Sequence, residues 1–120
     1  MEPNVISGAV TVEPSVLETI ARLTVLGVPG VEGIAEREVD RLLGTSGHSV
    51  TVEVHEGRVL IDVHILAGPD QSLLQLGRRV QHEVTRAVRQ MIGMPVEAVN
   101  VRIEDVLYAP AETWPNDEAA

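Results

Sequence analysis

Residues 50–66 carry the pattern that most constrains the fold, two runs of alternating apolar and polar residues on either side of Glu56 and Gly57. Alternation with period two places successive side chains on opposite faces of a β-strand. Gly57 tolerates the positive φ that a two-residue hairpin turn requires. A slip of one residue would move the apolar side chains to the wrong face, so the register is well specified. The apolar pairs predicted to share one buried face are Val50 with Val63, Val52 with Ile61, and Val54 with Val59.

Before the hairpin, the sequence predicts a strand, a helix and a second, short strand. Residues 5–12 alternate with period two, which predicts the first strand. Pro14 suits the first turn of a helix, because its missing N–H would have no partner there. Apolar residues then recur at helical spacing until Gly27, which favours the end of a helix. We expect a short strand over residues 31–37 and a connection over residues 38–49.

After the hairpin, the sequence predicts the longest helix and a last strand. The helix runs from residue 72 to about residue 92, with Asp70 or Ser72 as its N-cap. Gly93 ends it and Pro95 prevents it from resuming. Residues 99–104 alternate as a strand. One face of the helix is a continuous apolar stripe made of Leu73, Leu76, Gly77, Val80, Val84, Ala87, Val88 and Met91.

The order of these elements predicts an α+β fold. It is β-α-β-β-β-α-β, which favours a mostly antiparallel sheet with both helices packed on one face. A chain of 120 residues accommodates one compact domain. We expect a flexible lead over residues 1–4, a single α+β domain over residues 5–108, and a disordered acidic tail over residues 109–120.

The composition excludes several classes of function. The chain has 18 acidic residues against 9 basic ones, a formal charge of −9, which opposes binding to nucleic-acid phosphates or to an anionic membrane. It has no Cys, no Phe, one Tyr and one Trp, which excludes thiol chemistry and base-stacking platforms. We expect no signal peptide, and no run is long enough to span a membrane. We therefore expect a cytoplasmic protein that reaches a membrane only through a partner.

The second face of the hairpin holds the residues that most resemble a catalytic site. It carries Thr51, Glu53, His55, Arg58, Asp62 and His64. Histidine and carboxylate side chains bind zinc, so a metal-dependent enzyme that uses His55 and His64 is one hypothesis. However, the predicted register sets these two histidines several residue positions apart, too far for one ion without movement. We favour a solvated polar face, with no catalytic residue, metal site or cofactor.

Residues 27–30 raise a second hypothesis, an RNA-binding module. The string Gly27-Val28-Pro29-Gly30 matches the GxxG loop of KH domains. A KH loop joins two helices and normally holds a basic residue, whereas this string has Val and Pro in its middle and precedes a predicted strand. A structural turn is the favoured interpretation, because Gly ends the helix and Pro fixes φ.

The long predicted helix stands apart from the rest of the chain in charge. Residues 70–93 carry four Arg and two acidic residues, a local charge of +2, whereas the remainder carries −11. Its cationic side chains recur at steps of four, four and three, which places them on one face, opposite the apolar stripe. This face is either a contact surface for an acidic partner, including another copy of the chain, or an ordinary solvated face. Its members are Arg78, His82, Arg86 and Arg89.

In its order of turns and strands, the chain resembles the bacterial alkaline shock proteins, also called Gls-type envelope stress response proteins. Four stretches carry the likeness, namely residues 8–12, residues 28–34, the hairpin over residues 52–63, and residues 80–106. The resemblance implies a small cytosolic α+β protein without known catalytic activity, linked to alkaline or cell-envelope stress. It also implies self-association or docking to a membrane-anchored protein. Our leading hypothesis is therefore a non-enzymatic interaction protein of the envelope stress type.

Overall fold

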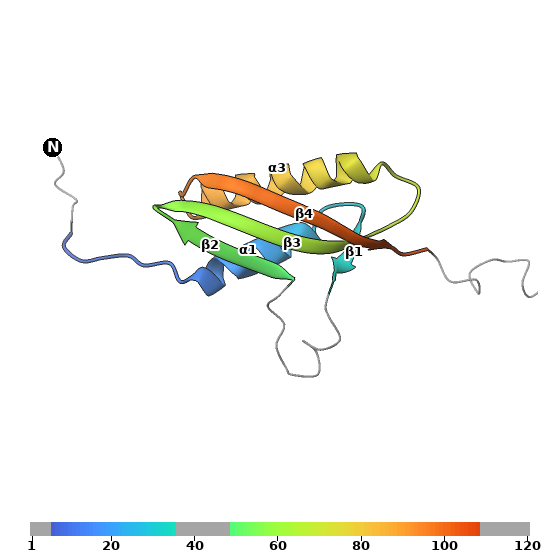
Figure 1. Cartoon of the computed structure of the whole chain (residues 1–120). Coiled ribbons are helices and arrows are strands. Elements are labelled where there is room, and N and C mark those ends of the chain that lie inside the picture. Colours follow the sequence, from blue (N-terminus) through green and yellow to red (C-terminus); the bar gives the residue numbers. More distant parts are fainter. Residues whose placement is uncertain (1–5, 36–48, 109–120) are drawn as a thin grey trace, which may run out of the picture.

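The fold is a two-layer α+β arrangement, seen in a computed structural model that describes residues 6–35 and 49–108 (Figure 1). Among the described residues, the two helices lie on the same face of the sheet, as predicted, and the sheet has four strands. From the first helix onward, the order of elements is also the predicted one. The elements are α1 (Pro14–Leu26), β1 (Val31–Ile34), β2 (Val50–His55), β3 (Arg58–Ala67), α3 (Leu73–Met91) and β4 (Val96–Val106).

Strand β3 is the centre of the sheet. Along one side it pairs antiparallel with β2 at one end and with β1 at the other. Along its other side it pairs with β4, and this pairing is parallel because α3 returns the chain to the starting end of the sheet. Two of the three pairings are therefore antiparallel, which confirms the predicted mostly antiparallel sheet.

The hairpin of β2 and β3 has the predicted register. Val50 lies opposite Val63, Val52 opposite Ile61, and Val54 opposite Val59. Both turn residues have positive φ, 51° at Glu56 and 79° at Gly57, the conformation that joins strands of right-handed twist. One part of the prediction is wrong, because Val54 is 43% exposed. Only the end of β2 that begins at the buried Val50 is covered by the helical layer.

The core lies between the sheet and the two helices. Every second residue of β3, from Val59 to Ala67, points into it and is buried. Helix α1 buries one stripe against the sheet, and α3 buries a stripe with a spacing of four residues. The helical residues that form this core are Leu17, Ala21, Val25, Leu76, Val80, Val84 and Val88.

The strand predicted over residues 5–12 is wrong for the part that the structure describes. Residues 6–13 form no strand, and the Val10 side chain is 96% exposed. Period-two alternation yields a strand only where a neighbouring edge can pair with it, and this segment lies beside none of the described strands. Strand β4 is longer than the predicted 99–104, whereas β1 ends at Ile34. Residues 1–5, 36–48 and 109–120, which include the predicted lead, most of the connection and the tail, lie outside the described residues.

Candidate interaction surfaces

Helix α3 is capped at both ends. The Ser72 hydroxyl caps its start by accepting a hydrogen bond from the Gln75 backbone N–H at 3.2 Å. At its other end, Gly93 adopts a φ of 83° and donates to the Val88 and Arg89 carbonyls. Because one stripe of this fixed helix is buried against the sheet, its opposite face points outward.

The outward face of α3 carries the predicted cationic residues. Arg78, His82, Arg86 and Arg89 lie along it, outside the buried stripe, and we call them the basic stripe. The structure brings the last three together around one shallow depression of about 330 Å³. Arg78 lies apart from them, because its guanidinium donates to Gln81 Oε1 at 3.2 Å and borders a different groove. The stripe therefore offers a cluster of two arginines and one histidine, and one outlying Arg.

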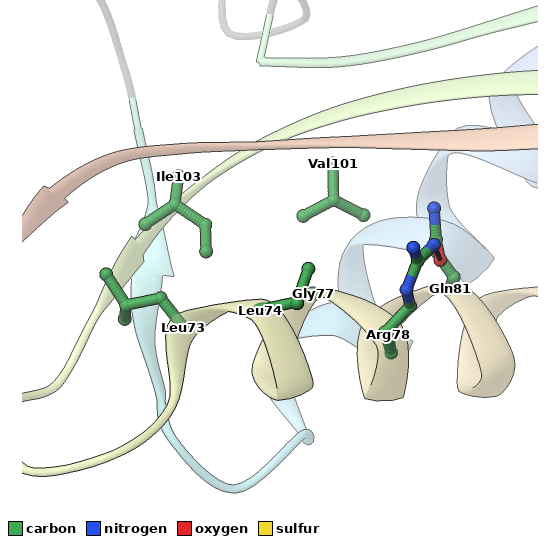
Figure 2. A pocket seen from close by; sticks show the side chains of 7 residues that line it. All are labelled: Leu73, Leu74, Gly77, Arg78, Gln81, Val101 and Ile103. Carbon is green, nitrogen blue, oxygen red and sulfur yellow. Dashed lines mark hydrogen bonds between the residues drawn. The ribbon is translucent and has the colours of Figure 1, made fainter.

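That second groove, of about 430 Å³, lies between α3 and β4 and was not predicted from the sequence. Figure 2 shows Val101 and Ile103 of β4 pointing toward the helix, and Arg78 and Gln81 of α3 pointing back toward the strand. The Gln81 amide donates to the Val99 carbonyl at 3.0 Å, which ties the helix to the strand. The residues lining this α3/β4 groove are Leu73, Leu74, Gly77, Arg78, Gln81, Val101 and Ile103.

The open face of the sheet carries the two histidines, and the structure pairs them with different acids. His55 Nε2 lies 3.0 Å from Glu53, and His64 Nδ1 lies 2.6 Å from Glu104 on β4. Asp62 instead accepts a hydrogen bond from an amide on β4. Within residues 6–35 and 49–108, no group of three or more His, Cys, Asp or Glu could hold a metal ion. The face is a set of separate polar pairs.

The GxxG string forms the turn between α1 and β1, as the favoured interpretation predicted. Val28 in its middle is buried, and the Pro29 carbonyl accepts a hydrogen bond from Arg79 at 2.9 Å. The Gly30 carbonyl accepts from the Gln71 amide at 3.0 Å and from the Gly68 N–H at 2.9 Å. These contacts fix the turn to the fold, and a strand follows it, so it lacks the helix–loop–helix setting of a KH domain.

Comparison of the sequence with known protein families identifies one family that matches. Residues 2–108 match the model of the alkaline shock protein family, which is described as having a cell envelope-related function. The chain belongs to this family. The resemblance seen in the sequence is thereby confirmed. No helix among the described residues is long and apolar enough to cross a membrane.

The proteins compared here with this family member share less than a quarter of their residues with it. Uncharacterized protein Spy1535 of Streptococcus pyogenes serotype M6 is 24% identical over 103 residues, covering 83% of this chain and 80% of the relative. Among solved structures, the copper form of the MamM CTD superposes with a TM-score of 0.54 at 17% identity, over 76% of this chain and 84% of that one. A MamM CTD fragment, 215–293, gives a TM-score of 0.51 at 17% identity, over 78% and 99% of the two chains. At this identity the likeness supports the fold alone.

Proposed function

We propose that this protein is a non-enzymatic, cytoplasmic protein of the cell envelope system that acts by binding other proteins. Its contact surface for acidic partners is the basic stripe, and the partners are further copies of the chain or a membrane-anchored protein. The membership of the envelope-related family supports the cellular setting. The observation that carries the proposal is the placement of His82, Arg86 and Arg89 around one depression on the exposed side of α3, in a chain with a charge of −9.

The physical reason is electrostatic. A cationic patch on an acidic protein attracts acidic surfaces locally, although the molecule as a whole repels them. His82, Arg86 and Arg89 surround one depression, so a single acidic side chain of a partner could contact several of them. The absence of catalysis is part of the proposal, and His55 and His64, which pair with separate acids, do not share one metal site.

A charge reversal tests the stripe. We expect the variant Arg78→Glu, Arg86→Glu, Arg89→Glu to keep its fold, because all three side chains lie outside the core, and to bind partners at least about tenfold more weakly at low salt. Sedimentation velocity measures self-association. Affinity purification from solubilised membranes, followed by mass spectrometry, measures capture of a membrane-anchored protein, and circular dichroism checks the fold.

A matched pair of single variants controls for net charge. Arg86→Glu changes the stripe, whereas Arg58→Glu makes the same change of charge on the open face of the sheet, at the start of β3. We expect only Arg86→Glu to weaken association or capture. Equal effects of the two variants, or no effect of the triple variant, would show that the stripe is a solvated helix face. Salt-dependent binding of RNA by the unmodified protein would replace the proposal with the RNA-binding hypothesis.

A further inference from the structure

The α3/β4 groove contains apolar side chains that the described part of the chain leaves exposed. Leu74 of α3 is 71% exposed, and Leu73 beside it is 36% exposed. Ile103 of β4 points toward the helix from the other side (Figure 2). Removing apolar surface of this kind from water lowers the free energy. The groove volume of about 430 Å³ is that of a site which accepts a bound group.

Arg78 gives one side of this groove a positive charge. Its guanidinium donates to the neutral Gln81 amide oxygen at 3.2 Å and forms no ion pair within residues 6–35 and 49–108. None of the described residues that line the groove is acidic. A guanidinium has five N–H donors, so Arg78 retains donors for a carboxylate. The groove therefore fits a segment that combines a large apolar side chain with acidic side chains close by.

Residues 109–120, which follow β4, have this composition. They contain the one Trp of the chain, three acidic residues and no basic residue. Glu112 lies two positions before Trp114, and Asp117 lies three positions after it. A residue that precedes Pro favours an extended backbone, so Pro115 lowers the conformational entropy that docking of Trp114 would cost. This segment is thus complementary to the groove in apolar content and in charge.

The end of β4 sets this segment within reach of the groove. Leu107 is tied to the end of β3, because its N–H donates to the Ala67 carbonyl at 2.8 Å. Ile103 lies four positions earlier on an extended strand, about 13 Å away. Trp114 follows Leu107 by seven positions, which span up to about 23–25 Å. Trp114 therefore reaches the groove if the chain turns back after β4, and Pro110 is a residue type that turns favour.

We propose that the chain's own residues 109–120 cover the α3/β4 groove, with the Trp114 ring between Leu74 and Ile103 and an acidic side chain next to Arg78. Because the contact is intramolecular, the groove meets the segment at an effective concentration of about 1 mM. A contact with a dissociation constant of only about 0.1 mM is then about 90% occupied. Composition alone predicts disorder for this segment, and the groove supplies the apolar contact that the segment cannot form by itself.

The fluorescence of Trp114 tests the docking in the intact chain, because no other Trp contributes. An indole ring that leaves water emits at shorter wavelength and is harder for acrylamide to quench. Leu74→Glu places a negative charge at an exposed site of the groove, where it repels the acidic segment. We expect this variant to shift the emission to longer wavelength and to raise the quenching constant at least about twofold, because docking leaves only about a tenth of the rings free.

Leu23→Glu is the matched control. Leu23 is 65% exposed, similar to Leu74, and lies on α1, which packs against β1 and β2. We expect this variant to leave the emission and the quenching of Trp114 unchanged, while circular dichroism shows that both variants keep the fold. Equal effects of the two variants would overturn the proposed site. An emission in the natural chain equal to that of the chain unfolded in urea would overturn the docking itself.

Arg78→Gln tests the charge contact. It removes the cation from the groove, so we expect a higher quenching constant, and high salt should have the same effect on the natural chain because it screens the contact. Arg58→Gln makes the same change of net charge at the start of β3, and it should have no effect. If Arg78→Gln changes the quenching no more than Arg58→Gln does, the proposed placement of an acidic side chain next to Arg78 is wrong.

Dilution separates the chain's own segment from that of a second copy. A quenching constant that is the same over an about hundredfold range of concentration supports the intramolecular contact, and one that rises on dilution overturns it in favour of a contact between copies. The inference goes beyond the proposed function and does not depend on it, because His82, Arg86 and Arg89 surround a different depression. Reversal of Arg86 and Arg89 should weaken partner binding and leave the fluorescence of Trp114 unchanged, so either proposal can fail alone.

Discussion

Ile61 is the residue at which the arrangement of the core can be tested most directly. It is fully buried in the middle of β3, with Val52 of β2 and Val99 of β4 opposite it on the two sides. Replacing it with Ala removes three buried carbon atoms, each contributing about 0.8 kcal/mol of transfer free energy. The cavity that remains between sheet and helices adds to this loss. We therefore expect Ile61→Ala to lower the free energy of unfolding by about 3–4 kcal/mol.

Val54 provides the contrast within the same hairpin. It lies on the same face of the sheet as Ile61 and belongs to the same alternating pattern, but 43% of it is exposed. Its truncation leaves little cavity, because solvent already reaches the site. We expect Val54→Ala to cost less than about 0.8 kcal/mol. In melting temperature the two variants should differ by at least about 10 °C, since 1 kcal/mol corresponds to about 4–8 °C in a domain of this size.

Urea titration followed by far-ultraviolet circular dichroism measures both values. Protein concentration must be the same for all variants, because any self-association adds to the apparent stability. A common slope of free energy against urea would show that the variants differ in stability and not in the surface exposed on unfolding. A loss below about 1 kcal/mol for Ile61→Ala, or equal losses for the two variants, would refute the placement of the core at the centre of β3.

Two further predictions concern turns with positive φ. Gly30 has a φ of 101°, and a Cβ there would meet the Gln71 side chain, so Gly30→Ala should lower the free energy of unfolding by more than about 1 kcal/mol in the same urea titration. Gly93 has a φ of 83° and open space around it, so Gly93→Ala should lower the free energy of unfolding less. Similar losses for both would show that the Gln71 contact contributes nothing. Glu56→Asn should raise the melting temperature by a few degrees, about 0.5 kcal/mol, because Asn adopts the left-handed conformation of Glu56 more readily; an unchanged or lower melting temperature would contradict the turn geometry.

The sequence predicted those parts of the fold that depend on local patterns. The register of β2 with β3 followed from period-two alternation around Gly57, and the limits of α3 followed from Ser72 and Gly93. The failures involve partners distant in sequence. Residues 6–12 alternate as well as β2 does, but no described strand edge lies beside them, and Val54 alternates correctly at an end of the sheet that the helices do not cover.

The same distinction applies to the surfaces. The basic stripe could be predicted because its four members lie on one helix, so that helical periodicity alone sets their common face. The α3/β4 groove could not, because it combines Leu74 of the helix with Ile103 of a strand 29 positions later, and only the parallel pairing of β3 with β4 brings them together. The contact of His64 with Glu104 depends on that pairing too. The sequence held one indication of the groove, because Leu74 is apolar although it lies just outside the buried stripe of α3.

Acidity and self-association are compatible in this chain because charge acts locally. At physiological ionic strength the Debye length is about 8 Å, so charges far from a contact are largely screened. What matters is the balance of charge within the contact itself. In the proposed contact, the basic stripe of α3 would set arginine side chains against the acidic side chains of a partner. The net charge of −9 therefore does not by itself prevent a contact in which unlike charges meet.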